Sequence, residues 1–425
     1  MTHFGIICLP ANGHLNPSIA LGYELKSRGH RVSLVGIPDV RTKAEEAELE
    51  FLQVGEREFP IGSLKKGLSQ LGKLTGLAAI RYGTNLLIKE SAMVLDEAPG
   101  IIKGAGIEAL LVDQASVGSL VAVTLDLPYI SICNAIHSNR EISIPPFTTS
   151  WQYNQAWWAL LRNQLGYMII GILLMPNPKN LIKYRQKFNV AKRSYYSSLA
   201  ILTQMPSELD FPRKRLPKRF HFTGPPIYKA GVLSDIPFPW EKLTGQPLIY
   251  ASMGTAVNQL AHIFKQIATA CEGLDVQLVI SLGGGLMPEE LPELPGNPIV
   301  VSYAPQLELL QKATLIITHA GMNTTLESLS YGVPMIAIPI TYDHPGIAAR
   351  IVWTGAGEMI PLKRLNVSNL RKKITKILTE DSYKQNAIRL QEAIKISGRS
   401  IRAADIIEQA IATGKPVLST QFQQN

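Results

Sequence analysis

Residues 3–36 read HFGIICLPANGHLNPSIALGYELKSRGHRVSLVG, and this stretch decides the class of fold. The apolar run at 3–10 is typical of a parallel strand that is buried on both faces. We expect the segment ANGHLNP (11–17) to be a loop, residues 19–30 to form a helix ending near Gly29, and residues 31–36 to form the next strand. Strand, loop, helix and strand in this order predict a Rossmann-like α/β beginning.

The same alternation continues along the chain, which favours two parallel sheets covered by helices. Further strand-like runs lie at 108–113, 128–133, 248–254, 276–285, 298–305, 314–321 and 333–340, and residues 367–413 have a helical pattern. A stretch rich in Pro and Gly at 224–247 interrupts the alternation. We therefore predict an N-terminal domain at 1–224, a linker at 225–246, a C-terminal domain at 247–413 and a flexible tail at 414–425.

Composition narrows the class of protein. Of the 425 residues, 46% are hydrophobic and 18% are charged, which excludes a disordered or fibrous chain. Cys8, Cys133 and Cys271 lie far apart, so we expect neither a disulfide framework nor a zinc knuckle, and a reducing, cytoplasmic location. The beginning of the chain is expected to be a strand rather than a secretory signal. No apolar run reaches the roughly 18 residues that a membrane-spanning helix needs.

The excess of positive charge lies in one region. The net charge is +9, and residues 140–230 contain 14 basic and 3 acidic residues, a local charge of +11. Such a region attracts nucleic acid, anionic lipid or acidic ligands. Because no helix-turn-helix, RNA-binding sheet or zinc finger is recognisable, we do not expect nucleic acid to be a partner.

A second informative segment is YAPQLELLQKATLIITHAGMNTTLESLSYGVPMIAIPITYDHPGIAAR, residues 303–350. A buried strand at 314–318 leads through His319 and Gly321 into a helix that begins near Asn323 and Thr324. The amino terminus of a helix favours anions, and the nearby polar side chains of Glu327, Asp343 and His344 suit hydroxyl groups. Together these features predict a site for a sugar nucleotide. Taken singly, each of these residues could instead be a helix cap or a solvated side chain.

The segment resembles the donor-binding signature of the UDP-glycosyltransferase family. The resemblance implies the GT-B fold, in which two Rossmann-like domains face each other across a cleft and a C-terminal helix region returns toward the N-terminal domain. It also implies a UDP-sugar as co-substrate, with no other cofactor and no metal. The implied donor-binding residues are Tyr303, Ala304 and Gln306 at the uracil end, His319, Gly321, Asn323 and Thr324 at the diphosphate, Glu327 at the ribose, and Asp343 and His344 at the sugar hydroxyls.

Two details qualify this donor site. The loop SMGT (252–255) resembles a second element of the same family and implies that Gly254 and Thr255 lie near the phosphates. His344 stands where the family usually has Gln, which leaves glucose, galactose and deoxysugars as possible sugars, with glucose preferred. The glycines at 283–285 are expected to form only a tight turn.

His14 and Asp113 are the candidate catalytic residues. Both follow strands of the first predicted sheet, so both side chains are expected at its carboxyl edge. A neutral imidazole can accept the proton of an attacking hydroxyl, and a carboxylate can orient the ring and stabilise the imidazolium. The resemblance supports His14 as the base and Asp113 as its partner in an inverting displacement. The alternative is that His14 caps the next helix and Asp113 forms a turn.

The acceptor is expected to bind to the first half of the chain. Residues 142–176 are rich in Trp and apolar side chains, and the candidate acceptor-binding residues are Asn139, Ile142, Phe147, Trp151 and Trp157. The stretch could be a buried helix, an apolar acceptor channel, or a helix at a membrane surface. In the last case, the basic residues at 179–193 and 213–219 would contact anionic lipid.

Across most of its length, including residues 109–141 and 207–224, the chain resembles the carotenoid branch of the family, the zeaxanthin glucosyltransferases. This implies a lipophilic acceptor that carries a hydroxyl group. The alternatives are transfer to another small hydrophobic acceptor (a flavonoid, macrolide or lipid), a UDP-sugar epimerase, and a non-catalytic carotenoid or nucleotide binder. An NAD dehydrogenase is disfavoured because residues 11–17 lack G-x-G-x-x-G. The sequence predicts no oligomeric state.

Overall fold

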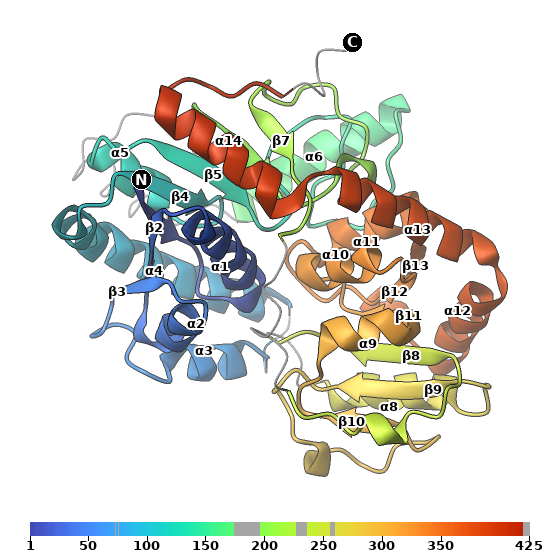
Figure 1. Ribbon diagram of the computed structural model, residues 1–425. Coiled ribbons are helices and arrows are strands. Elements are labelled where there is room, and N and C mark those ends of the chain that lie inside the picture. The colour runs from blue at the N-terminus through green and yellow to red at the C-terminus, as the bar shows by residue number, and fades with distance from the viewer. Residues whose placement is uncertain (73, 75, 174–195, 227–235, 256–259, 420–425) are drawn as a thin grey trace.

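The chain forms two α/β lobes, each built on its own parallel sheet (Figure 1). The computed structural model describes residues 1–425 except 73, 75, 174–195, 227–235, 256–259 and 420–425. In the amino-terminal lobe the sheet has the strand order β3-β2-β1-β4-β5-β6-β7, and in the carboxy-terminal lobe the order is β10-β9-β8-β11-β12-β13. The prediction of two Rossmann-like units is therefore confirmed.

The amino-terminal sheet consists of β1 (His3–Ile7), β2 (Arg31–Gly36), β3 (Glu50–Gln53), β4 (Ala109–Asp113), β5 (Tyr129–Cys133), β6 (Ile201–Thr203) and β7 (Phe220–Phe222). Its helices are α1 (Asn12–Ser27), α2 (Arg41–Glu46), α3 (Ser63–Gly72), α4 (Gly76–Ala105), α5 (Gly118–Thr124) and α6 (Trp157–Leu173). The strands are almost entirely buried, as expected for a sheet with helices on both faces.

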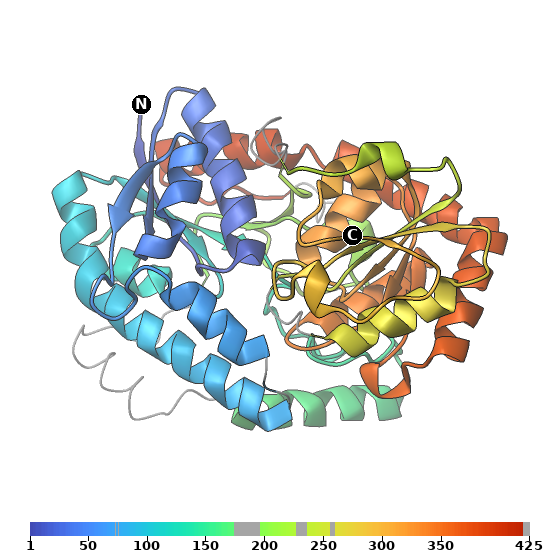
Figure 2. The same cartoon turned by 90° about the horizontal axis from the view of Figure 1, so that it is seen from below.

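The carboxy-terminal sheet consists of β8 (Leu248–Ser252), β9 (Gln277–Ser281), β10 (Ile299–Val301), β11 (Ala313–Thr318), β12 (Met335–Ala337) and β13 (Gly357–Met359). Its helices are α8 (Ala261–Cys271), α9 (Gln306–Lys312), α10 (Met322–Ser330), α11 (His344–Trp353), α12 (Val367–Thr379) and α13 (Asp381–Ile396). Figure 2 shows the two lobes side by side, with α4 along the amino-terminal lobe.

The last helix, α14 (Arg399–Thr413), lies on the amino-terminal lobe, although α13 before it packs on α10 of the carboxy-terminal lobe (Figure 1). Gly398, at a φ of 82°, makes the turn between the two helices. Ile407 and Ala410 of α14 join the core around β1, and Arg28, directly after α1, pairs with Asp405 and Glu408. The predicted return of the C-terminal helices to the first lobe is confirmed.

One local expectation was wrong. The segment 11–17 is not a loop, because α1 already begins at Asn12, and the amides of His14 and Leu15 donate to the Ala11 carbonyl. In the tail, whose flexibility stays a prediction, the amide of Val417 donates to Leu199 and that of Ser419 donates to Lys218. Residues 420–425 lie outside the described part.

The proposed linker, residues 225–246, lies between β7 and β8, and residues 227–235 of it are outside the described part of the chain. The two lobes also share an apolar cluster, in which Ile136 and Met205 of the first lobe are grouped with Ile347 and Ile351 of α11. The boundary between the lobes is therefore a packed interface on the side of α11. None of the helices in the described ranges combines the length and apolarity needed to cross a bilayer.

Candidate active site

His14 and Asp113 meet at the carboxyl edge of the amino-terminal sheet. His14 lies in the first turn of α1, directly after β1, and Asp113 is the last residue of the neighbouring strand β4. Nδ1 of His14 is 2.6 Å from Oδ2 of Asp113, whose side chain is fully buried. Oδ1 of Asp113 accepts from the amide of Ala115 at 2.9 Å. The sequence correctly predicted that these two side chains would emerge at one edge.

Further contacts hold the backbone of His14 and the carboxylate of Asp113. The carbonyl of His14 accepts from Ser18 Oγ at 2.7 Å and from Asn134 Nδ2 at 3.1 Å, and Asn134 also lies 3.3 Å from Asp113 Oδ2. Asn134 was missed by the sequence prediction, although its place directly after β5 puts it at the same sheet edge. The hydrogen bond to Asp113 uses Nδ1 of His14, the ring nitrogen opposite Nε2.

The negative charges around His14 favour the protonated form of its imidazole. Burial by itself would lower the pKa of His14, but the charge and hydrogen bond of Asp113 outweigh it and raise the pKa above its usual value. Asp343 of the other lobe and Glu90 of α4 contribute in the same direction. Glu90 itself is a buried carboxyl whose pKa rises to about 8, chiefly through burial, and no motif in the sequence marked it.

The candidate phosphate site lies at the end of β11 in the other lobe. Its central group is the imidazole of His319, which lies between Gly254 and Gly321. A Cβ at Gly254 would lie 2.5 Å from Cε1 of this ring, and one at Gly321 would lie 2.5 Å from Nε2. Gly254 also has a φ of 78°. Both the close contact of its backbone with the His319 ring and its backbone conformation therefore require glycine there.

Burial keeps His319 and His344 in their neutral forms. Burial, followed by repulsion from His344, lowers the pKa of His319 to about 3, and burial lowers the pKa of His344 to about 4. Their rings meet edge to face, with centroids 4.6 Å apart. These residues therefore offer hydrogen bonds rather than fixed positive charge.

The candidate nucleotide residues lie along α9 and α10. Gln306, the first residue of α9, donates to Glu327 Oε2 at 2.5 Å and to Thr324 Oγ1 at 3.5 Å. Burial raises the pKa of Glu327 to about 7. Asn323 and Thr324 lie in the first turn of α10, as predicted, and Asn323 Oδ1 accepts from Gln204 of the other lobe at 3.2 Å. Ala304 is buried, whereas Tyr303 is half exposed.

The expected turn at residues 283–285 is present, and a Cβ at Gly284 would lie 2.0 Å from the hydroxyl of Tyr303, so the turn makes room for this ring. Asp343 lies directly before α11, and its Oδ2 accepts from the amide of Ile136 at 3.1 Å. Thr255 Oγ1 accepts from Nδ2 of Asn12, two residues before His14, at 3.3 Å. These contacts bring the candidate donor residues against the lobe that carries His14.

The five candidate acceptor residues separate into two groups. Phe147 lies against α11, where a Cβ at Gly346 would be 2.2 Å from its carbonyl oxygen, and Asn139 lies in a loop next to buried His137. Trp151 instead packs on α6, where Arg162 lies 4.6 Å above its ring. Ile142 is exposed, and Trp157 is 77% exposed at the start of α6. Of the alternatives left open for residues 142–176, a fully buried helix does not fit α6, because its Trp157 is exposed.

Comparisons with known proteins agree with this architecture. The family profile described as "UDP-glucoronosyl and UDP-glucosyl transferase" matches residues 187–396. The chain is 32% identical to "Zeaxanthin glucosyltransferase" of Pantoea ananas (99% of this chain, 98% of the relative), and 30% identical to the protein of that name from Pseudescherichia vulneris (98% and 100%).

Solved structures share the fold at lower identity. "Crystal Structure Analysis of the Glycotransferase of kitacinnamycin" has a TM-score of 0.74 at 21% identity, with 96% of this chain and 98% of that chain covered. "Crystal Structure of CalG4, the Calicheamicin Glycosyltransferase" has a TM-score of 0.71 at 20% identity, with 98% and 100% covered. The similarities to relatives and solved structures agree with the sheet topology and with the expected donor-binding signature. The chain is therefore a hexosyltransferase of the GT-B fold and belongs to the UDP-glycosyltransferase family.

Proposed function

We propose that the protein is an inverting transferase that moves glucose from UDP-glucose to a hydroxyl group of a lipophilic acceptor, a carotenoid such as zeaxanthin. The observation that carries the proposal is the 2.6 Å contact between His14 and Asp113 at the lobe boundary, with Asp343 of the other lobe among the groups that raise the pKa of His14. A general base is thus within electrostatic reach of the candidate sugar-binding residues.

The proposed reaction is a single displacement. The acceptor oxygen forms its bond to the anomeric carbon as the bond from that carbon to the UDP oxygen breaks, and the hydroxyl proton passes to Nε2 of His14. Asp113 holds the opposite ring nitrogen and stabilises the imidazolium. The departing diphosphate receives hydrogen bonds from His319, Thr324 and the amino terminus of α10. One displacement inverts the anomeric centre.

A crossed assay tests this proposal. UDP-glucose, UDP-galactose and a UDP-deoxysugar are each combined with zeaxanthin, other hydroxylated carotenoids and a flavonoid, and products are identified by mass. We expect UDP-glucose with zeaxanthin to give the fastest transfer. Sugar transfer only to flavonoids would reject the carotenoid acceptor, and appearance of an epimerised donor without a glycoside would reject the transferase itself.

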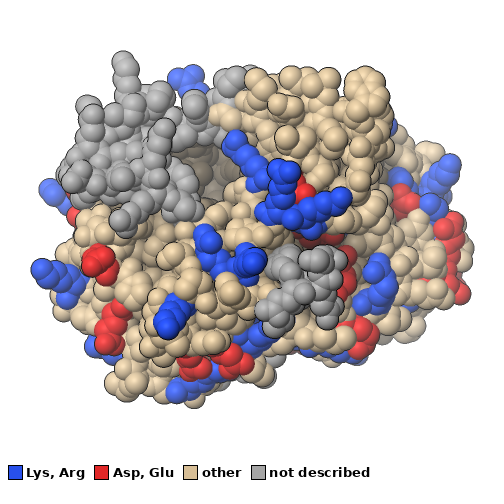
Figure 3. Space-filling view, turned by 90° about the horizontal axis from the view of Figure 1, so that it is seen from above, with Lys and Arg blue, Asp and Glu red and all other residues tan. Residues whose placement is uncertain are grey.

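The lipophilic acceptor suggests contact with a membrane. Exposed apolar side chains form a stripe along α6, consisting of Trp157, Trp158, Leu161, Leu165, Met168 and Ile169. Arg162 lies on the same helix, and Figure 3 shows Lys and Arg gathered on the face seen from above, beside an uncharged surface. The basic run predicted at 179–193 lies outside the described residues. We propose that this stripe contacts an anionic membrane from the cytoplasmic side.

Vesicle flotation tests the membrane contact. The protein should float with vesicles containing phosphatidylglycerol at low salt and dissociate at high salt. Replacing Trp157 and Ile169 by Ser should abolish flotation, whereas Trp240→Ser, a change to an exposed Trp of the proposed linker, should not. Equal flotation of all three proteins would rule out α6 as the contact.

A further inference from the structure

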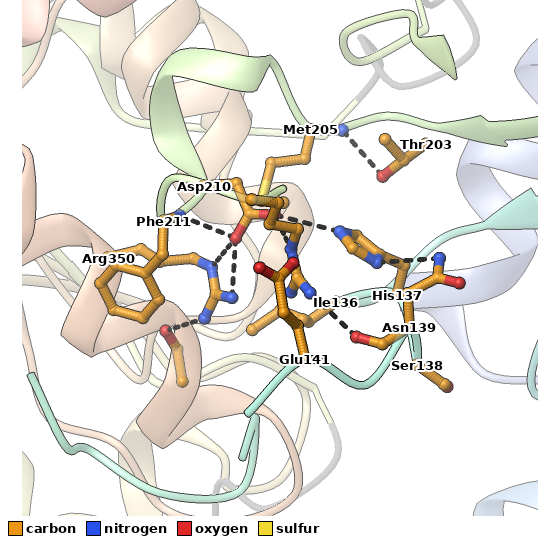
Figure 4. Close-up of polar contacts among 12 residues, drawn as sticks. Ile136, His137, Ser138, Asn139, Glu141, Thr203, Met205, Asp210, Phe211 and Arg350 are labelled. Carbon is orange, nitrogen blue, oxygen red and sulfur yellow. Dashed lines mark hydrogen bonds and ion pairs between the residues drawn. The ribbon is translucent and has the colours of Figure 1, made fainter. Parts of the chain in front are cut away.

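The buried carboxylate of Asp210 connects the two lobes through Arg350 (Figure 4). Asp210 belongs to the amino-terminal lobe, and Arg350, its partner on α11, is only 1% exposed. Arg350 Nε donates to Asp210 Oδ1 at 2.8 Å, and Nη2 lies 2.8 Å from the same oxygen. Burial would raise the pKa of Asp210, but the charges of Arg350 and Arg213 hold it well below its usual value. The carboxylate is therefore ionised and paired.

The second oxygen of Asp210 holds a different part of the molecule. Oδ2 accepts from Arg213 Nε at 2.6 Å and from Nε2 of His137 at 3.0 Å. Burial, with Arg213, lowers the pKa of His137 to about 4, so its imidazole is neutral. Nδ1 of His137 contacts Asn139 Nδ2 at 3.3 Å, and Arg213 Nη1 donates to the Asn139 carbonyl at 2.8 Å. Through these contacts Asp210 fixes the loop at 136–141.

The same loop also contacts the beginning of α11. The amide of Ile136 donates to Asp343, and the Phe147 carbonyl packs against Gly346 without space for a side chain. Helix α11 is thus held at its first turn by residues 136–147 and further along by Asp210. Its first turn carries the candidate sugar-binding residues, and the loop carries candidate acceptor-binding residues.

A second contact between the lobes is exposed, in contrast to the network of Asp210. Asn12 Nδ2 donates to Thr255 Oγ1 at 3.3 Å. A buried charge network with several hydrogen bonds resists separation far more strongly than one exposed bond, because breaking it leaves uncompensated charges in the interior. Of these two contacts, the network at α11 is therefore the one that we expect to fix the position of the lobes.

We propose that Asp210 and Arg350 are positioning residues that set the separation between the sugar held at α11 and the acceptor held by residues 136–147. This inference rests on the proposed transfer reaction. When the pair is loosened, water competes with the acceptor. In that side reaction the water oxygen forms the bond to the anomeric carbon as the bond to UDP breaks, and the proton of water passes to His14. The pair thus controls how the transferred sugar is divided between acceptor and water.

The test measures glucoside and free glucose from UDP-glucose and micellar zeaxanthin in the same reaction, for Asp210→Asn, Arg350→Lys and Arg350→Gln. We expect Asp210→Asn and Arg350→Gln to lower the kcat of transfer about 10- to 100-fold, since misplacement by about 1 Å has effects of this size. The ratio of free glucose to glucoside should rise about tenfold, UDP affinity should stay within about twofold, and Arg350→Lys should recover part of the loss because it retains the charge.

The matched control is Lys373→Met, which breaks a 2.6 Å ion pair with Glu358 inside the carboxy-terminal lobe. Urea unfolding is measured for every variant. If the Asp210 variant does not fold, Arg350→Lys makes the same comparison. A product ratio equal to that of the wild type and of Lys373→Met, with rates that follow stability alone, would overturn the inference. Absence of transfer in the wild type would instead reject the proposed function.

Discussion

His14 and His319 belong to opposite lobes of one candidate site, and their surroundings shift the pKa values of the two imidazoles in opposite directions. The carboxylate of Asp113 raises the pKa of His14, whereas burial and His344 lower the pKa of His319 to about 3. The first ring is suited to receive a proton, and the second remains neutral and can only donate or accept a hydrogen bond. In the proposed reaction, proton transfer therefore belongs to the amino-terminal lobe and recognition of the diphosphate belongs to the carboxy-terminal lobe.

Replacing His14 by Ala should have the largest effect on the rate of transfer. We expect the rate of transfer to fall about 1,000-fold, because general base catalysis contributes factors of this order. The affinity for UDP should be unchanged, since the candidate donor residues lie in the other lobe. Initial rates and calorimetric titration with UDP measure the two quantities, and near-normal turnover would refute the role of His14.

Gly254→Ala should weaken the binding of UDP next to His319. The new Cβ would lie 2.5 Å from the His319 ring, at a φ of 78°, and would displace the imidazole. We expect UDP to bind about tenfold more weakly, as for loss of a hydrogen bond to a charged group. Gly273→Ala is the matched control, because Gly273 has a φ of 73° but open space around it. Equal affinity in both variants would argue against His319 as a diphosphate ligand.

His344→Gln should have the smallest effect on the rate of transfer, and it tests whether His344 influences the pKa of His319. Because His344 lowers the pKa of His319, its removal should raise that pKa toward the ordinary value, which NMR titration of the ring nitrogens can follow. Gln keeps a neutral donor and acceptor at this position, so the rate with UDP-glucose should change only about two- to threefold. A His319 pKa that does not move would show that the two rings, 4.6 Å apart, are not coupled as described.

Much of this architecture was predictable because local patterns and edges of parallel sheets determine it. The buried strands that end at Asp113 and Thr318 were recognisable from apolar runs, and side chains after such strands must meet at one edge. The short strands β6, β7 and β13, of three residues each, carry too little pattern to be recognised. The long helix α4 was also not predicted.

Contacts between the lobes could not be predicted. Asp210 and Arg350 are 140 positions apart, and each resembles an ordinary charged surface residue until packing buries it. The beginning of α1 was misplaced because Asn, Gly and Pro between 11 and 17 are typical of loops, although Pro17 is accommodated within the helix. Asn134 was missed because an amide after a strand is common in turns.

The most direct test of the account is the pH dependence of kcat/KM for transfer in the wild type and in Asp113→Asn. Transfer requires a neutral His14, so activity should fall as the pH drops through the raised pKa of its imidazole. Without the carboxylate that pKa decreases, so the acid limb should move to lower pH while the maximal rate falls about 100-fold. An acid limb at the same pH in both proteins would contradict the claim that His14, oriented by Asp113, accepts the proton of the acceptor.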